Sequence, residues 1–417
     1  MLDPEELKQQ RLLRQQQREN ERRKTIVKLI LAFFALLLAS VLIFIFTRPK
    51  NTEPPAETTA VTQGEVIETT EPVNSDTVIH FAVAGDLNIT DNVVAAGGEN
   101  FDYTNAFLDV AHLLADADIS AVNFEGNFCD APYGSTGSAP TSLAQALSDA
   151  GVDLLQLANS YSINFGMSGL ATTIDRVRSV GMEPLGVYAN QEEAKKAKGY
   201  TLRNVGGIKI AFVSFTKGMD GLALPAGNEG CVNILYKDYS TTYRELDTER
   251  VSAVLDAVAK EKPDLTIALL HWGSQFNDTV STTQEEVRDL FLEKGVDAII
   301  GTHSHYLHKM EYDPENGTFV AYSLGDFFGD AQKSGSEYSV VLNLEITKSA
   351  ETGETKITGY DYTPIFTVAE EGKPLRVMRI KETMTAFENF YIDRVSQSTY
   401  DAMSNALQRI EARLKGE

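Results

Sequence analysis

Six side chains with metal-binding donor atoms stand directly after short apolar runs of the chain. Each run is followed at once by its donors: Asp86 after 78–84, Glu125 after 119–124, Asn159 after 154–158, His271 after 265–270, and His303 and His305 after 298–301. If the runs are strands of an α/β sheet, their carboxyl ends meet at the edge where such sheets bind ligands. Imidazole with carboxylate suits a transition-metal ion, and two such ions can clamp a phosphoryl group. The pattern predicts a divalent metal site, for Mn, Zn, Mg or Fe.

Taken singly, each of these residues also has an ordinary structural explanation. An aspartate after a strand usually caps a turn or a helix, and His271 could simply pack against its neighbours. The pair His303 and His305 is more specific, because an extended i, i+2 pair points both rings to the same side. His80 and His112 fall within the element patterns and are expected to be ordinary surface or core residues.

Apolar runs alternate with helical patterns from residue 77 onward. Further strands are expected at 208–214, 319–323 and 339–346, and amphipathic helices at 107–115, 142–150, 168–180, 248–260, 283–294 and 399–414. Most of the strand candidates are continuous apolar runs, as in sheets that helices cover on both faces. The run 339–346 alternates instead, which indicates an antiparallel edge or a second sheet. We therefore predict an α/β fold.

The N-terminal part has the pattern of a membrane anchor. Every residue from 29 to 46 is apolar except Ser40, a length that nearly spans a hydrocarbon core of about 30 Å. Eight Lys or Arg precede this span and only Arg48 and Lys50 follow it closely, so the N-terminus is expected in the cytoplasm. A cleavable signal peptide fits less well, because the basic region is long and no small-x-small site follows. A buried core helix would carry a polar stripe.

Charge separates the two parts of the chain. Residues 1–50 hold ten Lys or Arg and five Asp or Glu, so the net charge of −22 for the whole chain becomes −27 for residues 51–417. A domain this acidic is not expected to bind nucleic acid. Cys129 and Cys231 could pair in an oxidising compartment, but two cysteines in a domain of this size leave the question open.

Six short motifs follow one another between residues 78 and 330: Ala84-Gly85-Asp86, Asn123-Phe124-Glu125, Leu157-Ala158-Asn159, His271-Trp272-Gly273, Gly301-Thr302-His303-Ser304-His305 and Tyr322-Ser323-Leu324-Gly325-Asp326-Phe327. Their combination resembles the CapA-type capsule-synthesis proteins of the poly-γ-glutamate synthesis and export family. The resemblance implies a calcineurin-like metallophosphoesterase sandwich, in which two mixed β-sheets are flanked by helices and the metal site lies at the strand ends. It also implies an N-terminal anchor with an outward domain.

Four positions depart from the family pattern. Where family members carry Asn-Asn-His, this chain has Asn159-Ser160-Tyr161; in the metallophosphoesterase scheme the Asn-His pair supplies a metal ligand and a general acid. Tyr161 thus stands at the position of the family histidine, and a phenol with an ordinary pKa of about 10 is a poorer proton donor at neutral pH. Asp326 replaces the Asn of Gly-Asn-Phe, and Gln275 replaces the usual acidic residue after His-Trp-Gly. We predict little or no phosphoesterase activity.

These observations predict five segments: a cytoplasmic basic tail (1–25), a transmembrane helix (26–47), a disordered extracytoplasmic stalk (48–76), a CapA-like metallophosphoesterase-fold domain (77–365) and a C-terminal strand and helix extension that packs on it (366–417). The resemblance implies a role in the synthesis, export or anchoring of an anionic envelope polymer such as poly-γ-glutamate. Its partners would be the membrane and the polymer or its synthase complex. Two alternatives are an active divalent-metal hydrolase, acting on a phosphoester or the polymer, and a surface ligand-binding receptor.

Overall fold

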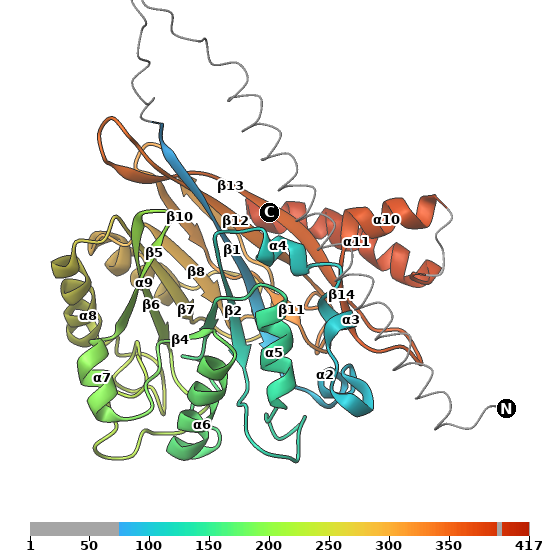
Figure 1. Ribbon diagram of the computed structural model, residues 1–417, viewed down its shortest axis with the longest axis horizontal. Helices are drawn as coiled ribbons and strands as arrows, with labels where there is room; N and C mark the ends of the chain where they lie inside the picture. Colours follow the sequence, from blue (N-terminus) through green and yellow to red (C-terminus); the bar gives the residue numbers. More distant parts are fainter. Residues whose placement is uncertain (1–74, 390–393, 417) are drawn as a thin grey trace, which may run out of the picture. The chain divides into compact units, whose positions relative to one another are not determined.

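The computed structural model describes residues 75–389 and 394–416. They belong to one compact unit, Pro72–Glu417, built from two mixed β-sheets with flanking helices (Figure 1). The predicted basic tail and transmembrane helix, and the predicted stalk up to residue 74, lie outside the described residues. Within the described ranges, no helix is both long enough and apolar enough to cross a membrane.

The larger sheet has eight strands: β1 (Thr77–Asn88), β2 (Ile119–Glu125), β3 (Leu154–Gln156), β4 (Glu183–Leu185), β11 (Asp326–Phe328), β12 (Tyr338–Lys348), β13 (Thr355–Val368) and β14 (Arg376–Arg379). The order is β14-β13-β12-β1-β2-β3-β4, with β11 also paired to β1. β1 runs parallel to β2 and β11 and antiparallel to β12. The carboxyl ends of β1, β2 and β11 therefore meet at one edge.

The smaller sheet has six strands: β5 (Tyr200–Val205), β6 (Ile208–Thr216), β7 (Leu265–His271), β8 (Ala298–Thr302), β9 (Met310–Asp313) and β10 (Thr318–Ala321). Their order is β5-β6-β7-β8-β10-β9. The four central strands are parallel, and β5 and β9 are antiparallel edges. The carboxyl ends of β7 and β8 thus meet at a single edge, as those of the larger sheet do.

The described helices are α2 (Asp91–Ala95), the 3-10 turn η1 (Gly98–Asn100), α3 (Thr104–Phe107), α4 (Ala111–Ala115), α5 (Thr141–Asp149), α6 (Gly166–Ser179), α7 (Gln191–Ala197), α8 (Thr248–Glu261), α9 (Thr282–Glu293), α10 (Ile380–Glu388) and α11 (Gln397–Lys415). All eight predicted strands are confirmed. The helix predicted at 107–115 is wrong as one element, because the chain turns between α3 and α4. That turn lets Phe107 and Val110 both enter the core while Leu108 stays exposed.

The core has three apolar layers, which explains the continuous apolar strands. One cluster lies between the two sheets, where the ring of Phe81 in β1 meets that of Phe212 in β6 at 5.6 Å. A second joins the larger sheet to α3–α6, and a third joins the smaller sheet to α8 and α9 (Figure 1). Because both faces of each sheet are covered, strands such as β2 and β7 are buried along their whole length.

The last fifth of the chain completes the larger sheet. β12 is antiparallel, as its alternation predicted, but it lies inside the sheet, between β1 and β13, rather than at an edge. β14 pairs with β13, and α10 and α11 lie side by side (Figure 1). Met403 and Ile410 of α11 are buried in the cluster between the sheets. Helix α11 is therefore part of the same core as the strands.

Candidate metal centre

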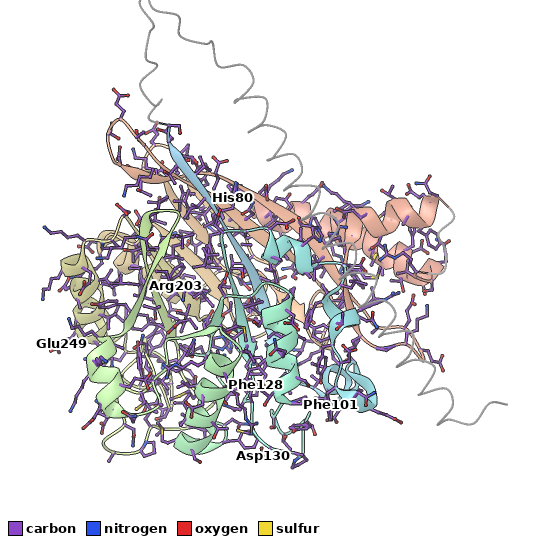
Figure 2. The ribbon with its side chains drawn as sticks, in the orientation of Figure 1. His80, Phe101, Phe128, Asp130, Arg203 and Glu249 are labelled. Atoms are coloured by element: carbon purple, nitrogen blue, oxygen red, sulfur yellow. The ribbon has the colours of Figure 1, made fainter. Side chains whose placement is uncertain are left out.

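Two labelled side chains mark the ends of the larger sheet in Figure 2. His80 lies near the start of β1, and Phe128 lies just beyond the carboxyl end of β2. The predicted ligands gather at the second of these ends. Asp86 is in the final part of β1 and Glu125 is the last residue of β2, whereas His271 ends β7 of the smaller sheet. The two sheets thus contribute to one site.

Five of the predicted ligands form what we term the carboxylate–imidazole cluster: Asp86, Glu125, His271, His303 and His305. It consists of two groups that share Glu125, one completed by His271 and His303 and the other by Asp86 and His305. Within each group, one donor atom from every residue lies within 4.8 Å of the others. All five residues are at most 2% exposed. A carboxylate shared between two groups suits a pair of neighbouring ions.

Asn159 lies beside this cluster and reaches its carboxylates through two successive hydrogen bonds, by way of Asn123. Its amide donates to Asn123 Oδ1 at 3.1 Å and to the Phe124 carbonyl at 2.7 Å, and its Oδ1 accepts from the Tyr161 amide at 3.0 Å. Asn123 in turn donates to Asp86 at 2.6 Å. These bonds hold the carboxylate of Asp86 in place. Direct contact of Asn159 with an ion stays a prediction.

His303 and His305 enter the cluster from a backbone that is not extended. Their φ angles are 91° and 59°, so the prediction of an extended pair is wrong. Residues other than glycine rarely adopt a positive φ angle, and the backbone strain of this conformation concentrates at functional sites. The curled backbone sends the two rings into different groups, with centroids 6.3 Å apart. The backbone amide of His303 also donates to Asp86 Oδ2 at 3.0 Å.

Burial governs the charge of the carboxyl groups. It raises the pKa of Asp86 to about 6 and that of Glu125 well above its ordinary value, and the charge of Asp86 raises the pKa of Glu125 further. Asp326, which begins β11, is also buried and has a raised pKa for the same reason. Three carboxyls this close are costly to ionise without a neighbouring cation.

The three imidazoles respond differently to the same surroundings. Burial lowers the pKa of His271 and His303 well below the ordinary value, so both rings are neutral and offer a lone pair. Burial also lowers the pKa of His305, but the nearby carboxylates outweigh it, Asp326 above all, and raise that pKa to about 10. His305 Nδ1 lies 2.8 Å from Asp326 Oδ1. Its proton compensates part of the carboxylate charge.

Two buried atoms of the cluster have no hydrogen-bond partner in the described part of the chain. They are Oε2 of Glu125 and Nδ1 of His303. An unsatisfied buried polar atom costs about 1–3 kcal/mol, and such atoms usually mark an unseen water or ion. Oxygen and imidazole donors together suit a divalent first-row metal. The residues present therefore fit a divalent metal ion.

The altered family motif lies against the cluster. Ser160 Oγ is 3.2 Å from Nε2 of His271. Tyr161 is half-buried, and burial raises its pKa to about 12, with the charges of Glu125 and Asp220 acting in the same direction. A phenol with this pKa keeps its proton at neutral pH. It can donate a hydrogen bond but is a weak general acid.

Asp326 is the site residue that sequence reasoning missed as a functional group. It was recognised only as a departure from Gly-Asn-Phe, yet it contacts His305 and accepts from Asn88 Nδ2 at 2.9 Å. The run expected at 319–323 ends before Leu324 and Gly325, and β11 contains only three residues and begins with Asp326 itself. The available signal was a polar residue directly before two adjacent phenylalanines, Phe327 and Phe328.

The family model described as bacterial capsule synthesis protein PGA_cap matches residues 80–331, more than half of the chain. The chain belongs to this PGA_cap family. The resemblance stated from the motifs is confirmed. The match contains every residue of the carboxylate–imidazole cluster, together with Asp326.

Individual proteins that resemble this chain share a quarter or less of their aligned residues with it. The PGA biosynthesis protein CapA of Bacillus subtilis is 22% identical over 321 residues, covering 76% of this chain and 80% of that protein. The capsule biosynthesis protein CapA of Bacillus anthracis is 25% identical over 248 residues, covering 58% and 57%. Among solved structures, the calcineurin-like phosphoesterase YfkN of Bacillus subtilis has 14% identity and a TM-score of 0.43, covering 82% of this chain and 98% of that chain.

Proposed function

We propose that this protein is a membrane-anchored, extracytoplasmic member of the PGA_cap family. It takes part in the synthesis, export or anchoring of an anionic envelope polymer such as poly-γ-glutamate, beside the synthase of that polymer. The observation that carries this proposal is the family match over residues 80–331. The two relatives described above are named for the biosynthesis of PGA or capsule. The apolar span at 26–47 supports the anchoring.

The carboxylate–imidazole cluster supports a metal-dependent form of this role. Asp86, Glu125, His271, His303 and His305 would hold one or two divalent ions, with Asn159 as a further donor. A metal there supplies Lewis acidity for an oxyanion of the ligand. The protein's own residues hold the donors in place: Asn123 orients Asp86, and Asp326 orients His305.

The second candidate function is hydrolysis by the same site. The two donor groups joined by Glu125 favour it, because phosphoester and peptide hydrolases use paired ions in this way. The position of the general acid argues against it, because Ser160 and Tyr161 stand where the family has Asn and His, and the pKa of Tyr161 is raised to about 12. We therefore place the accessory role first.

Removal and restoration of the gene test the proposed role. Cells that lack the protein should lose an anionic surface polymer, measured by amino-acid and phosphate analysis of surface extracts, and the natural gene should restore it. Complementation with Glu125→Gln and His303→Gln together then shows whether the cluster is needed. A deletion strain with an unchanged surface polymer would exclude the proposed role.

Metal analysis of the purified full-length protein tests whether the proposed role includes a metal centre. Stoichiometric Mn, Zn, Mg or Fe that is lost in the Glu125→Gln, His303→Gln double variant would support a metal centre. His80→Gln with His112→Gln is the matched control, because those histidines lie outside both donor groups. Equal metal content in the two double variants would exclude the cluster as the site.

A further inference from the structure

Aromatic and cationic side chains continue outward from the carboxylate–imidazole cluster. The ring of Phe276 stacks on His305 with centroids 5.0 Å apart, and the ring of Tyr306 meets Phe276 edge-on at 5.9 Å. Lys333 Nζ lies 4.6 Å above the Phe276 ring, and the Arg413 guanidinium lies 5.2 Å from the centre of the Tyr306 ring. The two rings therefore carry two cations beside the predicted metal centre.

One of these side chains, that of Arg413, lines a cavity of about 620 Å³. The segment 305–309 connects the cavity to the cluster, because His305 belongs to the cluster while His308 and Lys309 line the cavity. Arg409 and Arg413 of α11 line the opposite part. We term Lys309, Lys333, Arg409 and Arg413, with the rings of Phe276 and Tyr306, the basic track.

The basic track gathers four cationic side chains in a chain whose net charge is −22. Lys333 and Arg409 are exposed, so they are available to a ligand. Lys309 is held 2.6 Å from Glu311, and Arg413 lies 3.8 Å from Asp278. The cavity therefore presents cations together with carboxylate acceptors, rather than cations alone.

The walls of the cavity also contain acceptors for N–H groups. Asp278 and Glu285 line it. His308 is 3% exposed, and its Nε2 lies 2.8 Å from the Asn277 carbonyl, an acceptor, so Nε2 carries the hydrogen. Its Nδ1 is then an acceptor, and it has no hydrogen-bond partner within the described ranges. A ligand that offers N–H groups as well as anions matches this set.

We propose that the basic track binds an extended segment of a polyamide that bears free carboxylates, and leads it towards the carboxylate–imidazole cluster. The carboxylates of the ligand pair with Lys333, Arg409 and Arg413, and its amide N–H groups donate to Asp278 and Glu285. A polyphosphate offers only acceptors, so the same two carboxylates would repel it. This inference rests on the proposed function and names the surface that would contact the polymer.

Binding of fluorescein-labelled poly-γ-glutamate to the full-length chain, followed by fluorescence anisotropy, tests the proposal. We expect Lys333→Gln with Arg409→Gln to weaken binding about tenfold or more, because each lost ionic hydrogen bond is worth about 1.5–3 kcal/mol and 1.4 kcal/mol is tenfold. Lys195→Gln with Lys198→Gln removes two other exposed cations and is the matched control, expected within about twofold of the natural protein.

Two further arms sharpen the test. Arg413→Lys keeps the charge but loses the planar guanidinium over Tyr306, so we expect an intermediate loss of affinity. Unlabelled polyphosphate of matched charge should compete poorly against the labelled polymer. Thermal unfolding by circular dichroism verifies that each variant is folded, and both main substitutions are at exposed side chains, which seldom affect folding.

The proposal is overturned if the natural protein does not bind poly-γ-glutamate, if the track and control variants bind it equally, or if polyphosphate competes as well as the polyamide. These results are independent of the tests of function. A protein that restores the surface polymer in cells but fails the binding assay overturns the basic track alone. A deletion strain that keeps its polymer overturns the proposed function, whatever the anisotropy shows.

Discussion

Tyr161 and Ser160 show how two residues can alter the chemistry of a site that is otherwise intact. Both lie against the donor groups, Ser160 through His271 and Tyr161 through the field of Glu125. The donors themselves remain gathered and buried. The residues that would transfer a proton are therefore changed, while those that would hold a metal are present. This separation makes the catalytic question testable by substitution.

We expect Ser160→Asn with Tyr161→His to create metal-dependent hydrolysis of a generic phosphodiester that the natural protein lacks. Restoring a general acid typically gains about 10²–10⁴ in rate. The assay compares the natural and double-variant proteins with Mn²⁺, Zn²⁺ and Mg²⁺. Ser160→Asn with Tyr161→Phe is the control, because it restores the amide without a titratable ring. Brisk metal-dependent turnover by the natural protein would show that Tyr161 does not limit the site.

At the level of elements, the close approach of β1 and β11 positions the two aspartates of the site. Asp86 and Asp326 are direct partners in the parallel pairing of these strands. The approach depends on Gly85, where an added β-carbon would lie 1.8 Å from the Gly325 carbonyl oxygen. Backbone cannot give way as a flexible side chain can, so any larger residue must separate the strands.

Gly85→Ala should therefore disturb both stability and metal retention. We expect the free energy of unfolding to fall by about 1–3 kcal/mol, the usual cost of overpacking, and bound metal to decrease. Chemical denaturation and metal analysis measure the two effects. Gly359→Ala in β13 is the control, because the nearest atom to its β-carbon would be at 3.9 Å. Equal behaviour of the two variants would contradict the role given to Gly85.

Asp297, between α9 and β8, gives a pH-dependent contribution to stability. Burial raises its pKa from 3.8 to about 6, and its Oδ2 accepts from the Thr266 amide at 2.8 Å. Between these pKa values the folded state binds the proton more tightly than the unfolded state. Stability from this group is therefore present below pH 3.8 and is lost as the pH rises through about 6.

Asp297→Asn keeps an acceptor for Thr266 and removes the charge. At pH 7.5 we expect the variant to be more stable than the natural protein by about 1–3 kcal/mol, the equivalent of a shift of one to two pKa units. Near pH 4.5 the difference should be smaller, because most of the folded carboxyl is then protonated, and it should vanish below pH 3.8, where the unfolded carboxyl is protonated as well. Denaturant unfolding at the two pH values measures it. A difference that is the same at both would contradict the assignment.

For the whole molecule, topology across the membrane is the main prediction. Eight basic residues before the apolar span and two after it predict a cytoplasmic N-terminus and an external domain. Protease added to intact cells should digest residues 77–417 and spare an epitope at the N-terminus. Permeabilised cells are the control, in which both should be digested. Protection of residues 77–417 in intact cells would contradict this arrangement.

The sequence determined the parts of the fold and site that depend on local pattern. The runs before Asp86, Glu125 and His271 are long, apolar and buried on both faces, so each strand and its end could be identified without knowing its neighbours. Parallel strands then place their carboxyl ends together by rule. The order of the six motifs was also sufficient to identify the family, and the match over residues 80–331 confirmed it.

The tertiary structure decided what depends on contacts between distant segments. The place of Asp326 beside His305 depends on the pairing of β1 with β11, in which Asp326 lies opposite Asp86, 240 positions earlier in the chain. A three-residue strand leaves no local sequence pattern from which this pairing could be predicted. The positive φ angles of His303 and His305 persist because the surrounding packing over-determines them. Burial keeps His271 and His303 neutral, whereas the charge of neighbouring carboxylates, Asp326 above all, keeps His305 protonated. Both effects arise from the assembled sheets rather than from any single segment.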